Sequence, residues 1–285
     1  MSLCGRPEMA RLRRAVAEIE GTGLERAAGR LPLARALDPA LGGGLADDAL
    51  HEIAPAEPAD GTAAMGFALA LAARFLSRRP SGAIVVGESF AEREAGAPYG
   101  PGLAAHGLPL SHLVFVQAPD AEAAFWAMEE ALKSGAPAAV VGEIWNLKGY
   151  SLAASRRLLL AARKGGAPAL LVLASAYGQA DRLSSAAETR FEIAAAPSAK
   201  IPAAAGRDLP GPFACAARLV KARLGSGRAV DAAAGRLSRD QRSRLQNPVR
   251  LEWRSKERIF DDDPAISLSL AAESGDGPRA EARRH

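Results

Sequence analysis

The stretch 138–174 reads AAVVGEIWNLKGYSLAASRRLLLAARKGGAPALLVLA. It begins with one short apolar run, Ala138–Gly142, and ends with another, Ala169–Ala174. Between them, Ser151 can cap a helix that continues to about Lys164 and ends at a pair of glycines. Two apolar strands joined by a helix form the βαβ unit of a parallel sheet that is covered on both faces. The stretch therefore predicts an α/β fold with mostly parallel strands flanked by helices.

The same alternation of apolar runs and helical patterns continues on both sides of this unit. Residues 195–212 are rich in proline and indicate a linker, and residues 213–224 fit either a strand or a helix. The runs 249–253 and 258–260 can pair as a hairpin. Further strands are predicted at 50–54, 83–87, 113–117 and 191–194, and further helices at 60–78, 99–106 and 120–134.

In the helix that precedes the quoted stretch, one face is predicted to pack on the core. Phe125, Met128 and Leu132 follow the i, i+3, i+7 spacing of such a face. Trp126 lies off this stripe, so it is either a surface residue or part of a second interface. The pair Arg156-Arg157, at the start of the next helix, is either a solvated rim or a partner contact.

Composition indicates a globular protein of the reducing cytosol. The chain has 285 residues, 48% of them hydrophobic, so it can bury a sizeable core. Its two cysteines, Cys4 and Cys215, form no metal-ligand spacing and no disulfide framework. The four histidines are scattered, which favours structural roles. No run of 18 uncharged apolar residues occurs, so neither a membrane-spanning helix nor a membrane partner is expected, and the expected location is cytoplasmic.

Residues 51–63, HEIAPAEPADGTA, stand between a predicted strand and a predicted helix, where a phosphate-binding loop would lie. Such a loop needs G-x-x-x-x-G-K-[ST], whose amides and lysine bind phosphates and whose hydroxyl binds Mg²⁺. When the motif is aligned on Gly61, the first glycine, the lysine and the hydroxyl are replaced by Ala56, Thr62 and Ala63. The favoured interpretation is a plain strand-to-helix turn in which Asp60 and Thr62 cap the helix.

The order of these elements resembles that of RecA, most clearly over residues 82–147. Four short motifs more closely resemble the ImuA family, the RecA-like subunit of the bacterial mutasome. They are LGGGL with HEI at 41–53, Y-x-P-G-L at 99–103, WAMEEAL at 126–132 and SRRL-x-LAA at 155–162. The resemblance covers residues 41–196 well and 213–260 poorly.

The resemblance implies a RecA-like core at 41–196. It also implies an N-terminal helical segment at 1–40, a basic C-terminal region at 197–260 and a disordered tail at 261–285. By the same resemblance, the chain is an accessory protein of damage-induced mutagenesis, that is, of translesion synthesis in the SOS response. Its implied partners are ImuB, an error-prone DNA polymerase and RecA, with DNA and a second copy of the chain as further candidates.

Carrying RecA chemistry across residue by residue predicts a pseudo-ATPase without cofactor or metal. The strand that should end in a metal-binding aspartate continues as Gly142-Glu143, and Ser175 alone stands where a polar sensor pair would be. Glu88 matches the glutamate that orients the attacking water, or is a solvated residue at a strand end. Tyr99 matches the adenine-stacking tyrosine. Two alternatives stay open: an NTPase with residual nucleotide binding, and a single-stranded DNA-binding module.

Two connections match the DNA-binding loops of RecA, at about 143–150 and 177–190. They carry aromatic and basic side chains, the combination that stacks bases and holds phosphates of a single strand. These residues are Trp145, Lys148, Tyr150, Tyr177, Arg182 and Arg190.

Residues 218–258 carry 12 Lys/Arg and 4 Asp/Glu, a net charge of +8, whereas residues 259–285 are net −3. A stretch this basic can bind phosphates by counterion release or can bind an acidic protein surface. A solvated helix face is the alternative interpretation. The candidate contacts are Arg218, Lys221, Arg223, Arg236, Arg239, Arg242, Arg244, Arg250 and Arg254.

Residues 7–20 form an amphipathic helical pattern with Met9, Leu12, Val16 and Ile19 on one face. In RecA an N-terminal helix packs on the neighbouring subunit. The resemblance therefore implies that this helix docks outside its own core, with docking on the same chain as the alternative.

Overall fold

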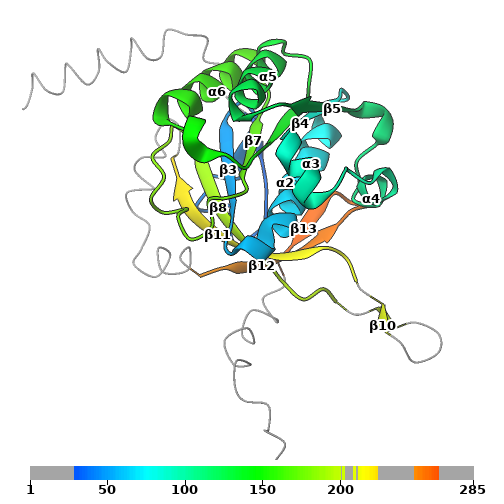
Figure 1. The fold of residues 1–285 in the computed structure, drawn as a ribbon. Helices are drawn as coiled ribbons and strands as arrows, with labels where there is room; N and C mark the ends of the chain where they lie inside the picture. Colours follow the sequence, from blue (N-terminus) through cyan, green and yellow to red (C-terminus); the bar gives the residue numbers. More distant parts are fainter. Residues whose placement is uncertain (1–28, 200, 203–207, 210, 224–246, 263–285) are drawn as a thin grey trace, which may run out of the picture.

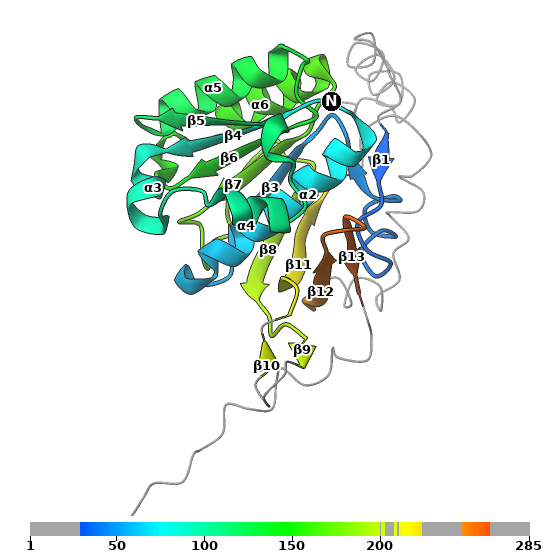
Figure 2. The same cartoon turned by 90° about the vertical axis from the view of Figure 1, so that its right-hand side faces the viewer.

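The computed structural model describes residues 29–199, 201–202, 208–209, 211–223 and 247–262. These residues form three layers, with a nine-stranded sheet between helices on both faces (Figures 1 and 2). The predicted α/β class, with a large and mostly parallel sheet flanked by helices, is confirmed. The predicted helix with Met9, Leu12, Val16 and Ile19 lies outside the described residues, as does the tail beyond 262.

The order of strands in the large sheet is β13-β12-β11-β8-β3-β7-β6-β4-β5. The six strands from β8 to β5 are parallel, and β11, β12 and β13 extend the sheet antiparallel beyond β8. Two short pairs lie apart from it, β1 (Arg30–Leu31) with β2 (Leu45–Ala46) and β9 (Ile201–Pro202) with β10 (Asp208–Leu209). The strands of the large sheet are β3 (Leu50–Pro55), β4 (Ala83–Glu88), β5 (Leu113–Ala118), β6 (Ala139–Ile144), β7 (Ala169–Leu173), β8 (Thr189–Ala195), β11 (Ala214–Ala222), β12 (Val249–Arg254) and β13 (Ile259–Asp261).

Helices cover the two faces of the sheet unequally. On one face lies α2 (Gly61–Arg78), joined by the short α4 (Gly100–Ala105), whose Leu103 packs into the same core. On the other face α5 (Ala121–Lys133) and α6 (Leu152–Gly165) lie side by side (Figure 2). The remaining helices are α3 (Ser89–Ala95), η1 (Pro58–Asp60), η2 (Leu110–His112) and η3 (Leu147–Gly149).

Local signals set the ends of α6 as the sequence predicts. Ser151 is the N-cap residue, and its hydroxyl accepts the N–H of Ala154 at 3.2 Å. The helix stops at Gly166, which adopts the left-handed conformation with φ 63° that favours glycine. The quoted stretch thus folds as the βαβ unit β6–α6–β7.

Each face of the sheet has its own apolar core. Under α2, Phe67 packs on Phe191 of β8 with ring centroids 5.5 Å apart, and Leu71 lies in the same cluster. Under α5 and α6, Met128 and Leu158 pack on the other face. Phe125, Met128 and Leu132 are all buried, which confirms the predicted stripe, and Trp126 beside them is 62% exposed.

Among the described residues, one helix, Pro58–Arg78, is long and apolar enough to span a membrane by length and composition alone. Two thirds of its apolar window, 67%, is buried inside the protein, as in the core helix of an α/β domain. It contains Arg74, so the uncharged apolar run at its start ends at residue 73. Arg74 is itself buried and donates to the carbonyl of Pro32.

The described part of the basic C-terminal region belongs to the same sheet as residues 41–196. Residues 213–224, which fitted strand or helix, contain β11, and it pairs with β8 from Cys215 to Ala222. The predicted hairpin forms from β12 and β13, and the indole N–H of Trp253 donates to the carbonyl of His106 at 3.0 Å. The boundary drawn at residue 196 therefore falls inside one continuous sheet.

His51 shows how the core constrains a titratable group. Its ring is fully buried in β3, with Nε2 2.8 Å from the carbonyl of Ala46 and Nδ1 2.8 Å from the hydroxyl of Thr189. Because the carbonyl can only accept, Nε2 carries the proton and Nδ1 accepts from Thr189. Burial lowers the pKa of His51 from 6.5 to about 4, so the folded protein keeps this ring neutral.

We expect His51 to destabilise the protein in acid. The unfolded chain takes up the proton as the pH falls through 6.5, and the folded chain resists it until about 4, so the folded state loses stability across that window. Between pH 7 and pH 5 this contribution amounts to about 2 kcal/mol. Urea unfolding at both pH values should show that His51→Gln loses less stability on acidification than the wild type does. An identical loss in both proteins contradicts the assignment.

Candidate functional site

In open α/β sheets, ligands bind outside the carboxyl ends of the parallel strands. At that edge this chain places the loop between β3 and α2, the start of α3 after β4, and the connections that follow β6 and β7. The degenerate phosphate loop, Glu88 and the candidate DNA loops all belong to this edge. It is therefore the place to look for a site.

The loop between β3 and α2 uses its own amide groups internally. The N–H of Ala56 donates to the carbonyl of Ile193 at 2.8 Å, which continues the pairing of β3 with β8. The N–H of Glu57 donates to Asp60 Oδ2 at 3.1 Å, and the N–H of Asp60 donates to the carbonyl of Glu57 at 3.0 Å. Pro58 has no N–H. These groups cannot close around a phosphate as the amides of a phosphate-binding loop do.

Asp60 places a carboxylate at the N-terminus of α2, where a phosphate would bind. Its Oδ1 accepts the N–H of Ala195 at 2.8 Å, and its Oδ2 accepts that of Glu57. The sequence predicts that this side chain caps α2. Asp60 does occupy the N-cap position, but its carboxylate bonds to the loop and to the end of β8 instead of to the helix amides. A negative charge next to the positive end of the helix dipole removes the attraction that this end offers to an anion.

Gly61 has no conformational reason to be glycine. Its φ of −53° is that of an ordinary helix residue, and a Cβ added there meets nothing within 4 Å. Thr62 is exposed and Ala63 is buried, and neither can supply an ammonium group. The loop therefore has the geometry of a strand-to-helix turn.

Glu88 has a structural task that the sequence did not suggest. It is 5% exposed, and its Oε1 accepts the N–H groups of Trp145 at 2.7 Å and of Asn146 at 3.1 Å. It is thus not a solvated residue. Its carboxylate joins the end of β4 to the connection after β6 through two backbone donors to Oε1.

Glu143 stands near the position of the missing metal-binding aspartate. Its Oε1 accepts the indole N–H of Trp145 at 3.1 Å. Burial raises the pKa of Glu143 above its ordinary value, and the neighbouring charge of Glu88 raises it further. Among the described residues, no three His, Cys, Asp or Glu side chains gather as a metal site.

Tyr99, the candidate adenine-stacking residue, is 72% exposed at the start of α4.

The six candidate DNA-loop residues differ in exposure. Arg190 is buried and so is not available to a nucleic acid strand, contrary to the sequence-based interpretation, and the half-buried Tyr150 donates its hydroxyl to the buried Glu52. Trp145 is half-buried, and its ring meets Phe90 edge-on with centroids 5.5 Å apart. The exposed members are Lys148, Tyr177 and Arg182.

Tyr150 and Arg190 meet at a buried carboxylate, Glu52 of β3. Arg190 Nε donates to Glu52 Oε2 at 2.7 Å, and both side chains are at most 2% exposed. The hydroxyl of Ser185 donates to the same oxygen at 3.0 Å, and that of Tyr150 donates to Oε1. Arg190 also donates to the carbonyls of Ala180 and Leu183, at 2.6 and 2.8 Å. Sequence reasoning missed Glu52, whose only signal was a charge inside an apolar strand.

Several of the candidate basic contacts also bind within the chain. Arg218 pairs with Glu192 at 2.8 Å and with Asp181 at 3.3 Å. Arg250 is 6% exposed and donates to the carbonyl of Pro197, so it is not a surface contact.

Three more of these basic residues are described. Lys221 donates to the carbonyl of Ser185 at 2.8 Å, and burial lowers its pKa to about 8. Arg254 pairs with Asp261, and Arg223 is exposed. The other candidates, Arg236, Arg239, Arg242 and Arg244, lie outside the described residues.

Comparison with known proteins adds no assignment. No protein-family model matches the chain, and no curated protein matches it.

We expect the Glu52–Arg190 pair to act as a unit in stability. Arg190→Met should cost about 3–5 kcal/mol, because it leaves a buried carboxylate without its charged partner. Glu52→Met should cost a similar amount, and the double variant should lose much less than the sum of the two. A double-mutant cycle in urea measures this coupling. Additive losses, with no coupling, would show that the two side chains do not depend on each other.

Proposed function

We propose that this chain is a catalytically inactive RecA-like accessory protein of damage-induced mutagenesis. In this role it binds ImuB, with RecA and an error-prone polymerase as further partners, in the cytoplasm. The motifs at 41–53, 99–103, 126–132 and 155–162 carry the resemblance to the ImuA family. The large, mostly parallel sheet flanked by helices is compatible with a RecA-like core.

The observation that best supports an inactive site is the carboxylate of Asp60 at the N-terminus of α2, held by Ala195 and Glu57. Phosphoryl transfer depends on the combined charge of a lysine and a metal ion around the phosphates. Residues 55–63 contain no lysine or arginine and two carboxylates, those of Glu57 and Asp60. A triphosphate placed here meets repulsion where an active site supplies attraction.

We expect that millimolar Mg-ATP or Mg-ADP does not shift the melting temperature and that no phosphate is released. Gly61→Ala is the matched control: it should melt at or slightly above the wild-type temperature, because alanine favours a helix in which no contact requires glycine. Saturable stabilisation of the wild type that Gly61→Ala abolishes, together with phosphate release that Glu88→Gln abolishes, contradicts the proposal and supports the NTPase alternative.

A second candidate function is single-stranded DNA binding at the carboxyl edge. Its support is that Lys148, Tyr177 and Arg182 are exposed on the connections after β6 and β7, the edge that also carries the Phe90–Trp145 pair. Stacking rings and cations in one place are what such a site needs. Arg190 is buried, and the hydroxyl of Tyr150 is bonded to Glu52, so two of the six candidate side chains are engaged inside the protein. This weakens the DNA-binding candidate relative to protein binding.

Two variants separate these functions. Reversal of Arg239, Arg242 and Arg244 to glutamate should weaken capture of ImuB or RecA, most at low salt, since exposed charges are screened as salt rises. Tyr177→Ala with Arg182→Ala should leave that capture unchanged. A loss of oligonucleotide binding in the second variant alone favours the DNA-binding module. Unchanged binding of ImuB, RecA and single-stranded DNA in the charge-reversal variant would show that this stretch is not the contact.

A further inference from the structure

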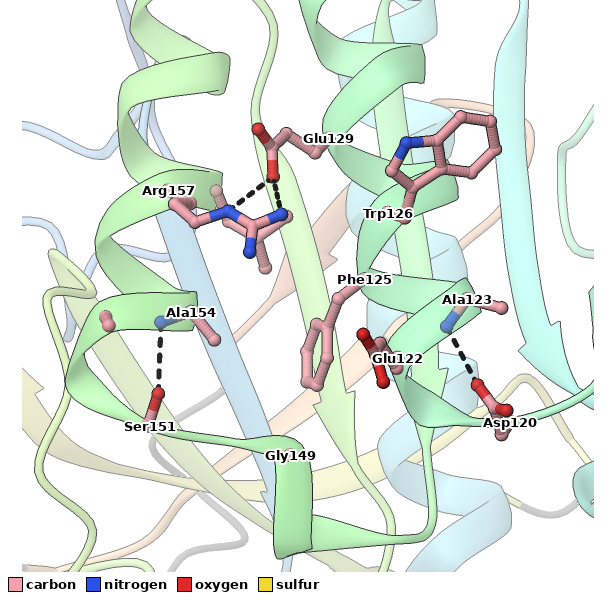
Figure 3. Close-up of a pocket in the computed structure, with 12 residues that line it drawn as sticks. Asp120, Glu122, Ala123, Phe125, Trp126, Glu129, Gly149, Ser151, Ala154 and Arg157 are labelled. Carbon is pink, nitrogen blue, oxygen red and sulfur yellow. Dashed lines mark hydrogen bonds and ion pairs between the residues drawn. The ribbon is translucent and has the colours of Figure 1, made fainter.

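A groove lies between α5 and α6 on the face of the molecule away from α2 (Figure 3). Its volume is about 640 Å³. Phe125 points into this space, Leu158 is also part of its lining, and both side chains are buried. On the α6 side the lining is small, with Gly149, Ala153 and Ala154, so another backbone can approach closely.

The spacing of the two helices explains where the groove opens. At their C-terminal ends they touch: a Cβ at Gly165 would lie 1.8 Å from the carbonyl oxygen of Leu132. The groove lies over their N-terminal halves. Exposed apolar side chains accompany it, with Trp126 at 62% and Leu160 at 52% exposure. The surface along the two helices is thus apolar enough to hold another amphipathic element.

The two ends of this surface differ in the sign of their charge. Asp120, Glu122 and Glu129 line the groove, and its one cation, Arg157, is already bound to Glu129 with Nε 2.8 Å from Oε2. Lys133 also pairs with Glu129, at 2.7 Å, so the negative charge of the groove end comes from Asp120 and Glu122. At the opposite end the last turn of α6 carries the exposed Lys164.

Residues 6–20, RPEMARLRRAVAEIE, carry the complementary pattern. Residues 6–14 hold four arginines and one acidic residue, Glu8, whereas residues 15–20 hold Glu18 and Glu20 and no basic residue. As a helix, the apolar face from Met9 to Ile19 is about 15 Å long. The surface of α6 from Ala153 to Lys164 is about 17 Å long by the same rise per residue.

The point where the described chain begins fixes the direction in which this segment can lie. Arg30 binds Glu188 at 3.1 Å. The charge of Arg163, in the last turn of α6, acts to lower the pKa of the same carboxyl group, so Arg163 is also near it. The chain thus starts near the C-terminal end of α6, and Figure 2 shows β1 at that end of the molecule. Residues 21–29 can span up to about 30 Å when extended, enough to bring Glu20 to Lys164.

We infer that residues 6–20 dock as a helix along the α5–α6 groove of their own chain. The Arg-rich beginning lies over Asp120 and Glu122, and the acidic end lies by Lys164. The short covalent link gives this intramolecular contact a high effective concentration relative to docking on a second copy. The partner of this surface is therefore the chain itself, in contrast to the docking on a neighbouring subunit that the RecA resemblance implies.

Cysteine cross-linking tests both the place and the direction. In a Cys4→Ser background the remaining Cys215 is buried and burial raises its pKa to about 12, so it stays unreactive. Matched pairs are Met9→Cys with Ala153→Cys and Val16→Cys with Leu160→Cys, each seven residues apart along its helix, and Ala153 and Leu160 are exposed. Swapped pairs are Met9→Cys with Leu160→Cys and Val16→Cys with Ala153→Cys. Under mild oxidation the matched pairs should link several-fold faster than the swapped pairs, as monomers and at a rate independent of protein concentration.

A charge variant adds a second measurement. Glu122→Lys should slow the link between positions 9 and 153 several-fold, whereas Glu94→Lys on α3, equally exposed but away from the groove, should not change it. Linked dimers whose rate rises with concentration would overturn docking on the same chain in favour of a second copy. Equal rates for matched and swapped pairs would overturn the groove itself.

Discussion

The buried ion pair between Glu52 and Arg190 is the contact on which the carboxyl edge of the sheet depends. It joins the central strand β3 to β8, and its hydrogen bonds reach Tyr150 after β6 and Ser185 after β7. A buried pair of this kind is stable only when the remaining donors and acceptors are also satisfied. Arg190 meets that demand through backbone carbonyls of the connection after β7, so the shape of that connection follows from one guanidinium group.

The same rule governs the rest of this edge. Asp60 and Glu88 both accept backbone N–H groups from neighbouring segments, Asp60 from the loop and β8, and Glu88 from the connection after β6. In a nucleotide-binding protein such groups at the strand ends face a ligand. Here the carboxylates of Asp60 and Glu88 accept backbone N–H groups of the same chain. The exposed side chains that remain, such as Tyr177, lie on the rims of these connections.

The sequence predicts the parts of this structure that depend on local signals. The apolar runs locate β4, β6 and β7, and Ser151 and the glycines after Lys164 mark the ends of α6. Sequence-based prediction fails where a side chain's partner is distant in the chain. Glu52 and Arg190 are separated by 138 positions, and no local pattern indicates that they pair. The nine-residue β11 stayed ambiguous because a strand paired on both sides and carrying Arg218 and Lys221 has no clear period. The sequence also does not tell whether a basic residue is exposed. Arg250 and Arg223 both follow apolar residues in the basic stretch, but Arg250 is buried and Arg223 is exposed.

On the proposed function, loss of nucleotide binding and stability of the loop are one physical event. Buried backbone groups need partners, and a loop shaped around a phosphate leaves its amides unpaired when the phosphate is absent. On this proposal, Asp60 acts as the internal acceptor, so the turn between β3 and α2 needs no ligand for its stability. The fold then serves to present surfaces to partners and not to bind a nucleotide. Exposed apolar side chains, such as Trp126 and Leu160 on α5 and α6, are then the places where contacts with other segments can form.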